Sequence, residues 1–210
     1  MKIKAIAALA KKNKYIQMWD DEKTRVQWIS NGYAAYPLYG MPELDGESVL
    51  TVLDVPEMER EKYTVRMGPM PDGCVFDDTD ETERALAPTV GLTLGYGGQV
   101  LAPARTSLGL LFFDPEFLRP VQDKPYELYE RETDGGRIYL AIKSGLLLTA
   151  VIMPKAPNEE DILDRLETLE RELRTTISRR AAESREEGAE AGEQYGVEVD
   201  EETGEVLDGG

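Results

Sequence analysis

Two stretches of the chain repeat one order of apolar runs and polar turns. Residues 15–42 and 126–154 each contain a strand-like run, a polar turn, a second run, a turn ending in glycine, a third run and a closing Met-Pro. The offset between equivalent residues is nearly constant, 111 from Tyr15 to Tyr126 and 112 from Pro42 to Pro154. Short apolar runs joined by glycine turns are typical of antiparallel strands, and Asn31-Gly32 favours a tight turn with positive φ at both residues. The repeat therefore predicts two three-stranded meanders.

The segments before the meanders carry helix and strand signals. Apolar positions at helical spacing predict a helix over residues 3–13. Residues 99–102 predict a strand and residues 106–121 a helix, with Pro115 suited to a first turn. The second unit then has the order β-α-β-β-β. Further elements are a helix over 44–53 and a strand over 62–67, whereas 68–97 gives no clear pattern.

The C-terminal part differs in composition from the rest. Asn158 is suited to cap a helix over residues 158–187, with acids in its first turn and arginines late. Its apolar residues recur at spacings of four and three, as in a coiled coil, and the rhythm lapses at Thr176 and Arg180. The positions that this rhythm offers for self-association are Ile162, Leu166, Leu169 and Leu173. Packing on the protein's own body is the alternative. Residues 188–210 predict a disordered acidic tail.

Composition argues against an enzyme. The chain has no histidine, so the commonest general base and metal ligand is missing, and its one cysteine, Cys74, can form neither an internal disulfide nor a multi-thiolate site. A hydrolase that uses carboxylates is a further option, but no convincing carboxylate pair stands out. We therefore expect no catalytic residue, cofactor or metal. No apolar run reaches membrane-spanning length, and Lys4 interrupts the only leader-like segment. These features predict a cytoplasmic protein without membrane contact.

The net charge of −17 is concentrated at the C-terminal end. Residues 158–210 hold 18 acids and 6 bases, net −12, which leaves −5 for residues 1–157. No acid precedes Asp20, so the helix over 3–13 and the residue after it offer Lys4, Lys11, Lys12 and Lys14. A solvated face on a core-packing helix is one interpretation of these lysines. A cationic surface for a polyanion is the other.

The second unit resembles the repeating unit of bacterial replicative DNA sliding clamps. The resemblance rests on Leu101-Ala102-Pro103-Ala104-Arg105, the predicted helix after it, the meander and the exit Met153-Pro154. It is clearest over residues 98–157, and residues 1–60 follow by pattern alone. The implied fold is α+β, with duplicated β-α-β-β-β units (about 1–67 and 98–157) that form one domain with antiparallel sheets over residues 1–157. A C-terminal helix and an acidic tail follow.

The resemblance implies a non-enzymatic protein associated with double-stranded DNA, such as a replication accessory factor of a phage or another mobile element. Backbone phosphates would then contact Lys4, Lys11, Lys12, Lys14 and Arg105. Two departures weaken this step: a clamp protomer has two or three such domains, and the predicted second helix also carries Asp114 and Glu116. The alternative is an interaction or assembly protein that keeps the fold without DNA contact, and self-association or a protein partner is expected with it.

Overall fold

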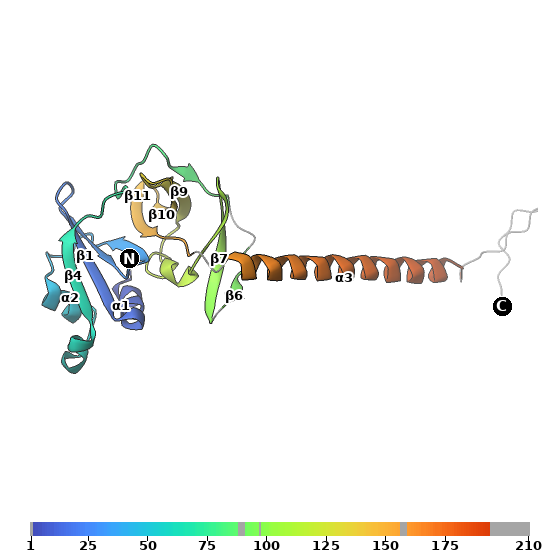
Figure 1. Cartoon of the computed structure of the whole chain (residues 1–210), viewed down its shortest axis with the longest axis horizontal. Coiled ribbons are helices and arrows are strands. Elements are labelled where there is room, and N and C mark those ends of the chain that lie inside the picture. The colour runs from blue at the N-terminus through green and yellow to red at the C-terminus, as the bar shows by residue number, and fades with distance from the viewer. Residues whose placement is uncertain (1, 88–90, 97, 156–158, 194–210) are drawn as a thin grey trace, which may run out of the picture. The chain divides into compact units, whose positions relative to one another are not determined.

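The protein has a mixed α+β fold. The computed structural model describes residues 2–87, 91–96, 98–155 and 159–193, with side chains except those of 96, 159–163 and 182–193. The chain divides into two units, residues 1–156 and 157–210 (Figure 1). The elements of the first unit are α1 (Ile3–Asn13), β1 (Tyr15–Asp21), β2 (Val26–Ser30), β3 (Ala34–Pro37), α2 (Gly46–Val52), η1 (Glu57–Lys62), β4 (Thr64–Pro69), β5 (Arg84–Ala85), β6 (Leu94–Tyr96), β7 (Gln99–Thr106), β8 (Gly109–Phe113), η2 (Pro115–Leu118), β9 (Glu127–Glu132), β10 (Ile138–Ser144) and β11 (Leu147–Ile152).

The second unit contains α3 (Glu159–Glu193). The helix continues beyond residue 187, where the sequence places its end. Of the predicted disordered tail, residues 188–193 belong to α3, and residues 194–210 lie outside the described residues.

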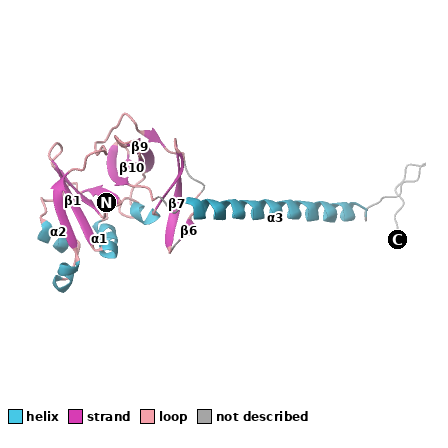
Figure 2. Ribbon diagram, viewed as in Figure 1, coloured by secondary structure: helices cyan, strands magenta, loops and turns pink. Residues whose placement is uncertain are grey.

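Both predicted meanders are present and share one sheet. The strand order is β4-β1-β2-β3-β11-β10-β9-β5. Figure 2 shows β1, β9 and β10 of this sheet in magenta. The meanders meet where β3 pairs antiparallel with β11, with Ala35 opposite Val151 and Ala34 opposite Ile152. A second sheet of three strands has the order β6-β7-β8. The expectation of purely antiparallel sheets is wrong at one place: β4 pairs parallel to β1, with Tyr15 opposite Thr64. The chain passes through α2 and η1 between β3 and β4, and such a crossover allows a parallel return.

The predicted helix over residues 106–121 does not form. Residues 99–113 instead make the hairpin β7–β8, and only the short turn η2 follows. Gly109 has φ +108°, a conformation that an α-helix does not contain. Thr106 Oγ1 donates a hydrogen bond to the carbonyl oxygen of Gly109 at 2.9 Å and so closes the turn of the hairpin. A short apolar run fits helix or strand, and the aromatic pair Phe112-Phe113 favours the strand.

The turn at Asn31-Gly32 differs from its expected geometry. Gly32 has φ +91°, but Asn31 is not among the described residues with positive φ. The Asn31 side chain instead accepts hydrogen bonds from the backbone N–H groups of Tyr33 (3.1 Å) and Ala34 (2.9 Å). These hydrogen bonds to the Asn31 side chain close the turn, so it does not need a positive φ at Asn31.

The large sheet is covered on both faces, so strand residues alternate between two cores. On β10, Leu140 and Ile142 face the larger core, which also contains residues of α1, α2 and η2, whereas Tyr139 and Ala141 face the smaller one. None of the described residues in the smaller core belongs to a helix. Its cover comes from residues 70–76, within the stretch where the sequence shows no pattern.

Aromatic contacts fix this cover to the sheet. The Phe76 ring meets the rings of Trp19 and Trp28 edge to face, at centroid distances of 5.7 and 5.0 Å. Trp19 and Trp28 are opposite each other on β1 and β2. Their burial against Phe76 gives a loop segment the role that a helix has on the other face.

Candidate functional site

The predicted DNA-contact lysines lie on or next to one exposed face of α1. The opposite face of α1 buries Ile6, Ala7, Leu9 and Ala10 in the larger core. This amphipathic pattern explains the orientation of the helix, and it leaves the lysines in solvent. We call the exposed group Lys4, Lys11, Lys12 and Lys14 the α1 lysine face.

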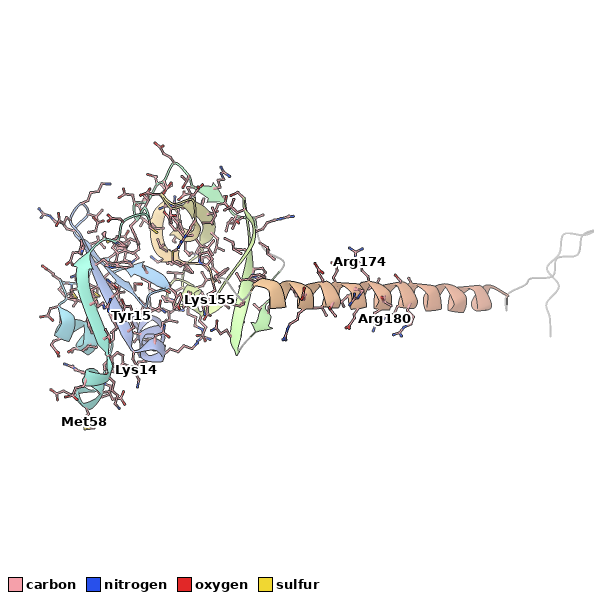
Figure 3. All side chains as sticks on the ribbon, viewed as in Figure 1. Lys14, Tyr15, Met58, Lys155, Arg174 and Arg180 are labelled. Atoms are coloured by element: carbon pink, nitrogen blue, oxygen red, sulfur yellow. The ribbon has the colours of Figure 1, made fainter. Side chains whose placement is uncertain are left out.

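Lys14 ends the helix and connects it to the sheet. Its φ of 51° is left-handed, and its N–H donates to the carbonyl oxygen of Ala10 at 2.8 Å. Its own carbonyl oxygen accepts from the N–H of Thr64, which begins β4. Figure 3 shows Lys14 beside Tyr15 at the start of β1. The backbone of Lys14 is therefore held, and its side chain is exposed.

One member of the lysine face has an acidic partner. Lys12 Nζ donates to Glu116 Oε2 at 2.6 Å, and Arg119 lies 3.4 Å from Oε1 of the same carboxylate. The hydrogen bond to Glu116 raises the pKa of Lys12, and the bond from Lys12 lowers the pKa of Glu116. Since Glu116 already neutralises part of the positive charge of Lys12, Lys4 and Lys11 are the better candidates for binding an external anion.

A groove with a volume of about 760 Å³ lies between α1 and η2. Apolar residues in its lining are Ile3, Ala5, Ala8 and Leu9, and charged residues in its lining are Lys2, Lys4, Lys12, Glu116 and Arg119. The backbone N–H of Lys2 also donates to the carbonyl oxygen of Pro120 at 2.8 Å, which joins the two segments at one end. The charged lining thus holds four cations and one carboxylate.

Arg105 is not part of this surface. It lies on β7 in the three-stranded sheet, opposite Leu110 of β8, and its side chain is exposed. The sequence places it at the start of a helix that the structure replaces with a hairpin. The structure therefore brings four of the five predicted DNA contacts together and leaves Arg105 on a separate element.

The predicted self-association residues form an apolar stripe on α3. Leu169 and Leu173 have 48% and 52% of their surface exposed, and Leu166 is partly exposed. Ile177, which the sequence reasoning missed, extends the stripe with 66% exposure. The side chain of Ile162 lies outside the described residues. We call Leu166, Leu169, Leu173 and Ile177 the α3 stripe.

Sequence reasoning also missed a buried ionic cluster of Glu83, Arg131 and Lys143. Arg131 is 0% exposed, and its Nε and Nη2 both donate to Glu83 Oε2, while Lys143 Nζ donates to Glu83 Oε1 at 2.7 Å. Arg131 Nη1 donates to the carbonyl oxygens of Val75 (3.1 Å) and Asp77 (2.8 Å). The available signal was Lys143, which follows the apolar run of β10; Arg131 lies in β9, whose largely charged sequence gives no such signal.

The charges of the Glu83 cluster are paired with one another. Burial raises the pKa of Glu83, but hydrogen bonds from Lys143 and Arg131 outweigh it, and the pKa ends below its ordinary value. Among the described side chains, no buried polar atom lacks a hydrogen-bond partner. With each charge paired, the cluster fixes residues 75–83 to β9 and β10.

Cys74 and the acidic side chains are the other groups with chemistry of their own. Burial raises the pKa of the Cys74 thiol, so its thiol form is favoured over the nucleophilic thiolate. Within the described part of the chain, no three acidic or cysteine side chains are grouped to hold a metal ion. Nor does any helix there have the length and apolar character to cross a membrane.

No protein-family model matches the chain, and neither a curated protein nor a solved structure matches it.

Proposed function

We propose that the protein is a non-enzymatic, clamp-like factor that associates with duplex DNA through the α1 lysine face. The observation that carries the proposal is this face itself, on a helix that contains lysines and no acid. Ammonium groups on one exposed surface suit the phosphate backbone, which binds cations irrespective of base sequence. A role in replication in the cytoplasm of a host cell belongs to the same proposal.

The pairing of the two meanders supports the clamp-like part of the proposal, although the β7–β8 hairpin replaces the helix that the second β-α-β-β-β unit requires. Each meander follows a helical segment, α1 before β1 and η2 before β9, and β3 and β11 join the two halves edge to edge. The α1 and η2 segments also meet, through Lys12 and Glu116. A duplicated unit predicts two halves whose sheets pair through one strand of each half, as β3 and β11 do.

The acidic C-terminal part gives this association a limit. Residues 158–210 carry a net charge of −12, which repels a polyanion at low salt. We therefore expect weak DNA binding by the full chain and stronger binding by residues 1–157. Clamp-like association needs contact without tight adhesion, so this balance suits the proposal.

The test is duplex-DNA binding by residues 1–157 as salt is raised, measured by fluorescence anisotropy. The double variant Lys4→Glu and Lys11→Glu should weaken binding and lower the slope of log K against log salt by about 2, because each phosphate contact contributes about one. Lys12 stays unchanged, so its bond to Glu116 is preserved.

The matched control reverses Arg25 and Arg137, which are exposed in the turns after β1 and β9. It changes net charge by the same amount at a different place, so binding should stay close to wild type. Equal losses in both variants would mean that net charge, not the α1 face, governs binding. No binding by residues 1–157 at low salt removes the proposed mechanism.

A second candidate function is assembly through α3, favoured by the exposed α3 stripe. Apolar side chains exposed in a row at helical spacing mark an interaction surface. In this alternative the protein keeps its fold without contacting DNA and acts through copies of itself or a protein partner. Light scattering decides it: full-length protein should exceed the monomer mass, and residues 1–157 should not. Monomers in both cases exclude self-assembly through α3.

A further inference from the structure

The α3 stripe is a narrow seam on a long helix. Its members expose about half of their surface or more at Leu169, Leu173 and Ile177. The helix has 35 residues, so it is roughly 50 Å long and offers room for a partner helix over several turns. A seam with apolar residues at spacings of three and four is complementary to another copy of itself.

The charges along α3 are divided into blocks. Residues 159–170 have a net charge of −5, from the acids Glu159, Glu160, Asp161, Asp164, Glu167 and Glu170 and the base Arg165. Residues 171–181 have a net charge of +3, from the bases Arg171, Arg174, Arg179 and Arg180 and the acid Glu172. Figure 3 shows the side chains of Arg174 and Arg180 extending from α3. The blocks therefore have opposite signs and lie next to each other on one helix.

We propose that α3 pairs antiparallel with α3 of a second copy of the chain; this rests on the assembly function proposed above. In an antiparallel pair with the leucines in contact, residues 159–164 of each helix, with a net charge of −4, lie along residues 171–176 of the other, with a net charge of +1. A parallel pair instead places like blocks side by side. A parallel seam that continues past Thr176 also brings Arg180 against Arg180 of the second copy. The antiparallel pair avoids both repulsions.

The seam fixes the register of this pair. With Leu166 opposite Leu169 of the second copy, the two leucines of each helix form two equivalent layers. Arg165, just before Leu166, then flanks the seam next to Glu172 of the second copy. In a parallel pair, Arg165 instead approaches Glu170 of the second copy. The partner of Arg165 thus distinguishes the two orientations.

A charge-swap cycle on the full-length protein tests the orientation, with the dimer dissociation constant measured by sedimentation equilibrium. Arg165→Glu should raise this constant roughly tenfold, because two flanking attractions become repulsions. Adding Glu172→Arg should restore it. The matched control, Arg165→Glu with Glu170→Arg, should not. Rescue by the control instead of the Glu172→Arg variant would establish the parallel pair and overturn the proposal.

A distance measurement that alters no charge on α3 tests the same orientation. A spin label on Ala181→Cys, in a Cys74→Ala background, should report a label separation of roughly 40 Å or more, because in this register the two labelled positions lie about 27 residue steps apart along the axis of the helix pair. Labels at a common level, near 20 Å apart, would refute the antiparallel pair. A wild-type chain that sediments as a monomer overturns assembly itself, and a dimer insensitive to all three variants excludes the α3 seam as its interface.

Discussion

Removal of the Arg131 guanidinium should destabilise the protein strongly. Arg131→Met keeps the length and apolar stem of the side chain and removes every donor. The carbonyl oxygen of Asp77 then loses its guanidinium donor, that of Val75 keeps only the Tyr139 hydroxyl, and Glu83 keeps only Lys143. Breaking a buried ion pair by removing one member costs about 3 to 5 kcal/mol. We expect the lower end, about 3 kcal/mol, because Lys143 still compensates Glu83.

Tryptophan fluorescence during urea unfolding at pH 7 is the appropriate assay. Trp19 and Trp28 both contact Phe76, so their emission reports whether residues 70–83 stay on the sheet. Arg137→Met is the control, since Arg137 is exposed and its loss should change the free energy of unfolding by less than about 0.5 kcal/mol. If Arg131→Met lowers the free energy of unfolding by under about 1 kcal/mol, the Glu83 cluster does not hold this segment.

Two tyrosines give further predictions. Burial raises the pKa of Tyr139 to about 12, and its hydroxyl accepts from the N–H of Val75 at 2.9 Å. The stabilisation by the neutral Tyr139 hydroxyl is therefore complete below its unfolded pKa of about 10 and is lost as the pH rises toward its folded pKa. Tyr139→Phe should lower the free energy of unfolding by about 1 kcal/mol at pH 7, and the difference from wild type in urea unfolding should shrink by pH 11. The Tyr36 hydroxyl donates to the carbonyl oxygen of Phe117 at 2.7 Å and joins β3 to η2, so Tyr36→Phe should lower the free energy of unfolding by about 1 to 2 kcal/mol. Tyr39→Phe, which removes a 3.4 Å contact from a half-exposed side chain, should change it less, and equal effects would contradict this reasoning.

The sequence predicts elements well where a local pattern has one physical solution. Helix α1 and all six meander strands follow from spacing, turn residues and apolar runs, and β11 follows from a run that is apolar on both faces. The hairpin β7–β8 was missed because a run such as Gly109–Phe113 satisfies helix and strand alike. Tertiary contacts select the strand over the helix here, and one of them is the hydrogen bond from the N–H of Ser107 to Glu130 Oε2.

Long-range pairing could not be predicted in the same way. The parallel contact of β4 with β1 depends on the length of the crossover, not on the residues of β4. The Glu83 cluster joins residues 48 and 60 positions apart, and no local spacing reveals such a contact. The α1 lysine face was predictable because one helix carries it, whereas Arg105 was misplaced together with its predicted helix.

The ends of the large sheet bear on how the protein avoids aggregation. A long, flat, unpaired edge is a template on which another chain can add a strand. At one end β5 is only the pair Arg84–Ala85, and at the other β4 carries Arg66 and closes with Pro69, which has no N–H to donate. Both edges are thus poor templates, and the eight-stranded sheet is protected against growth by strand addition.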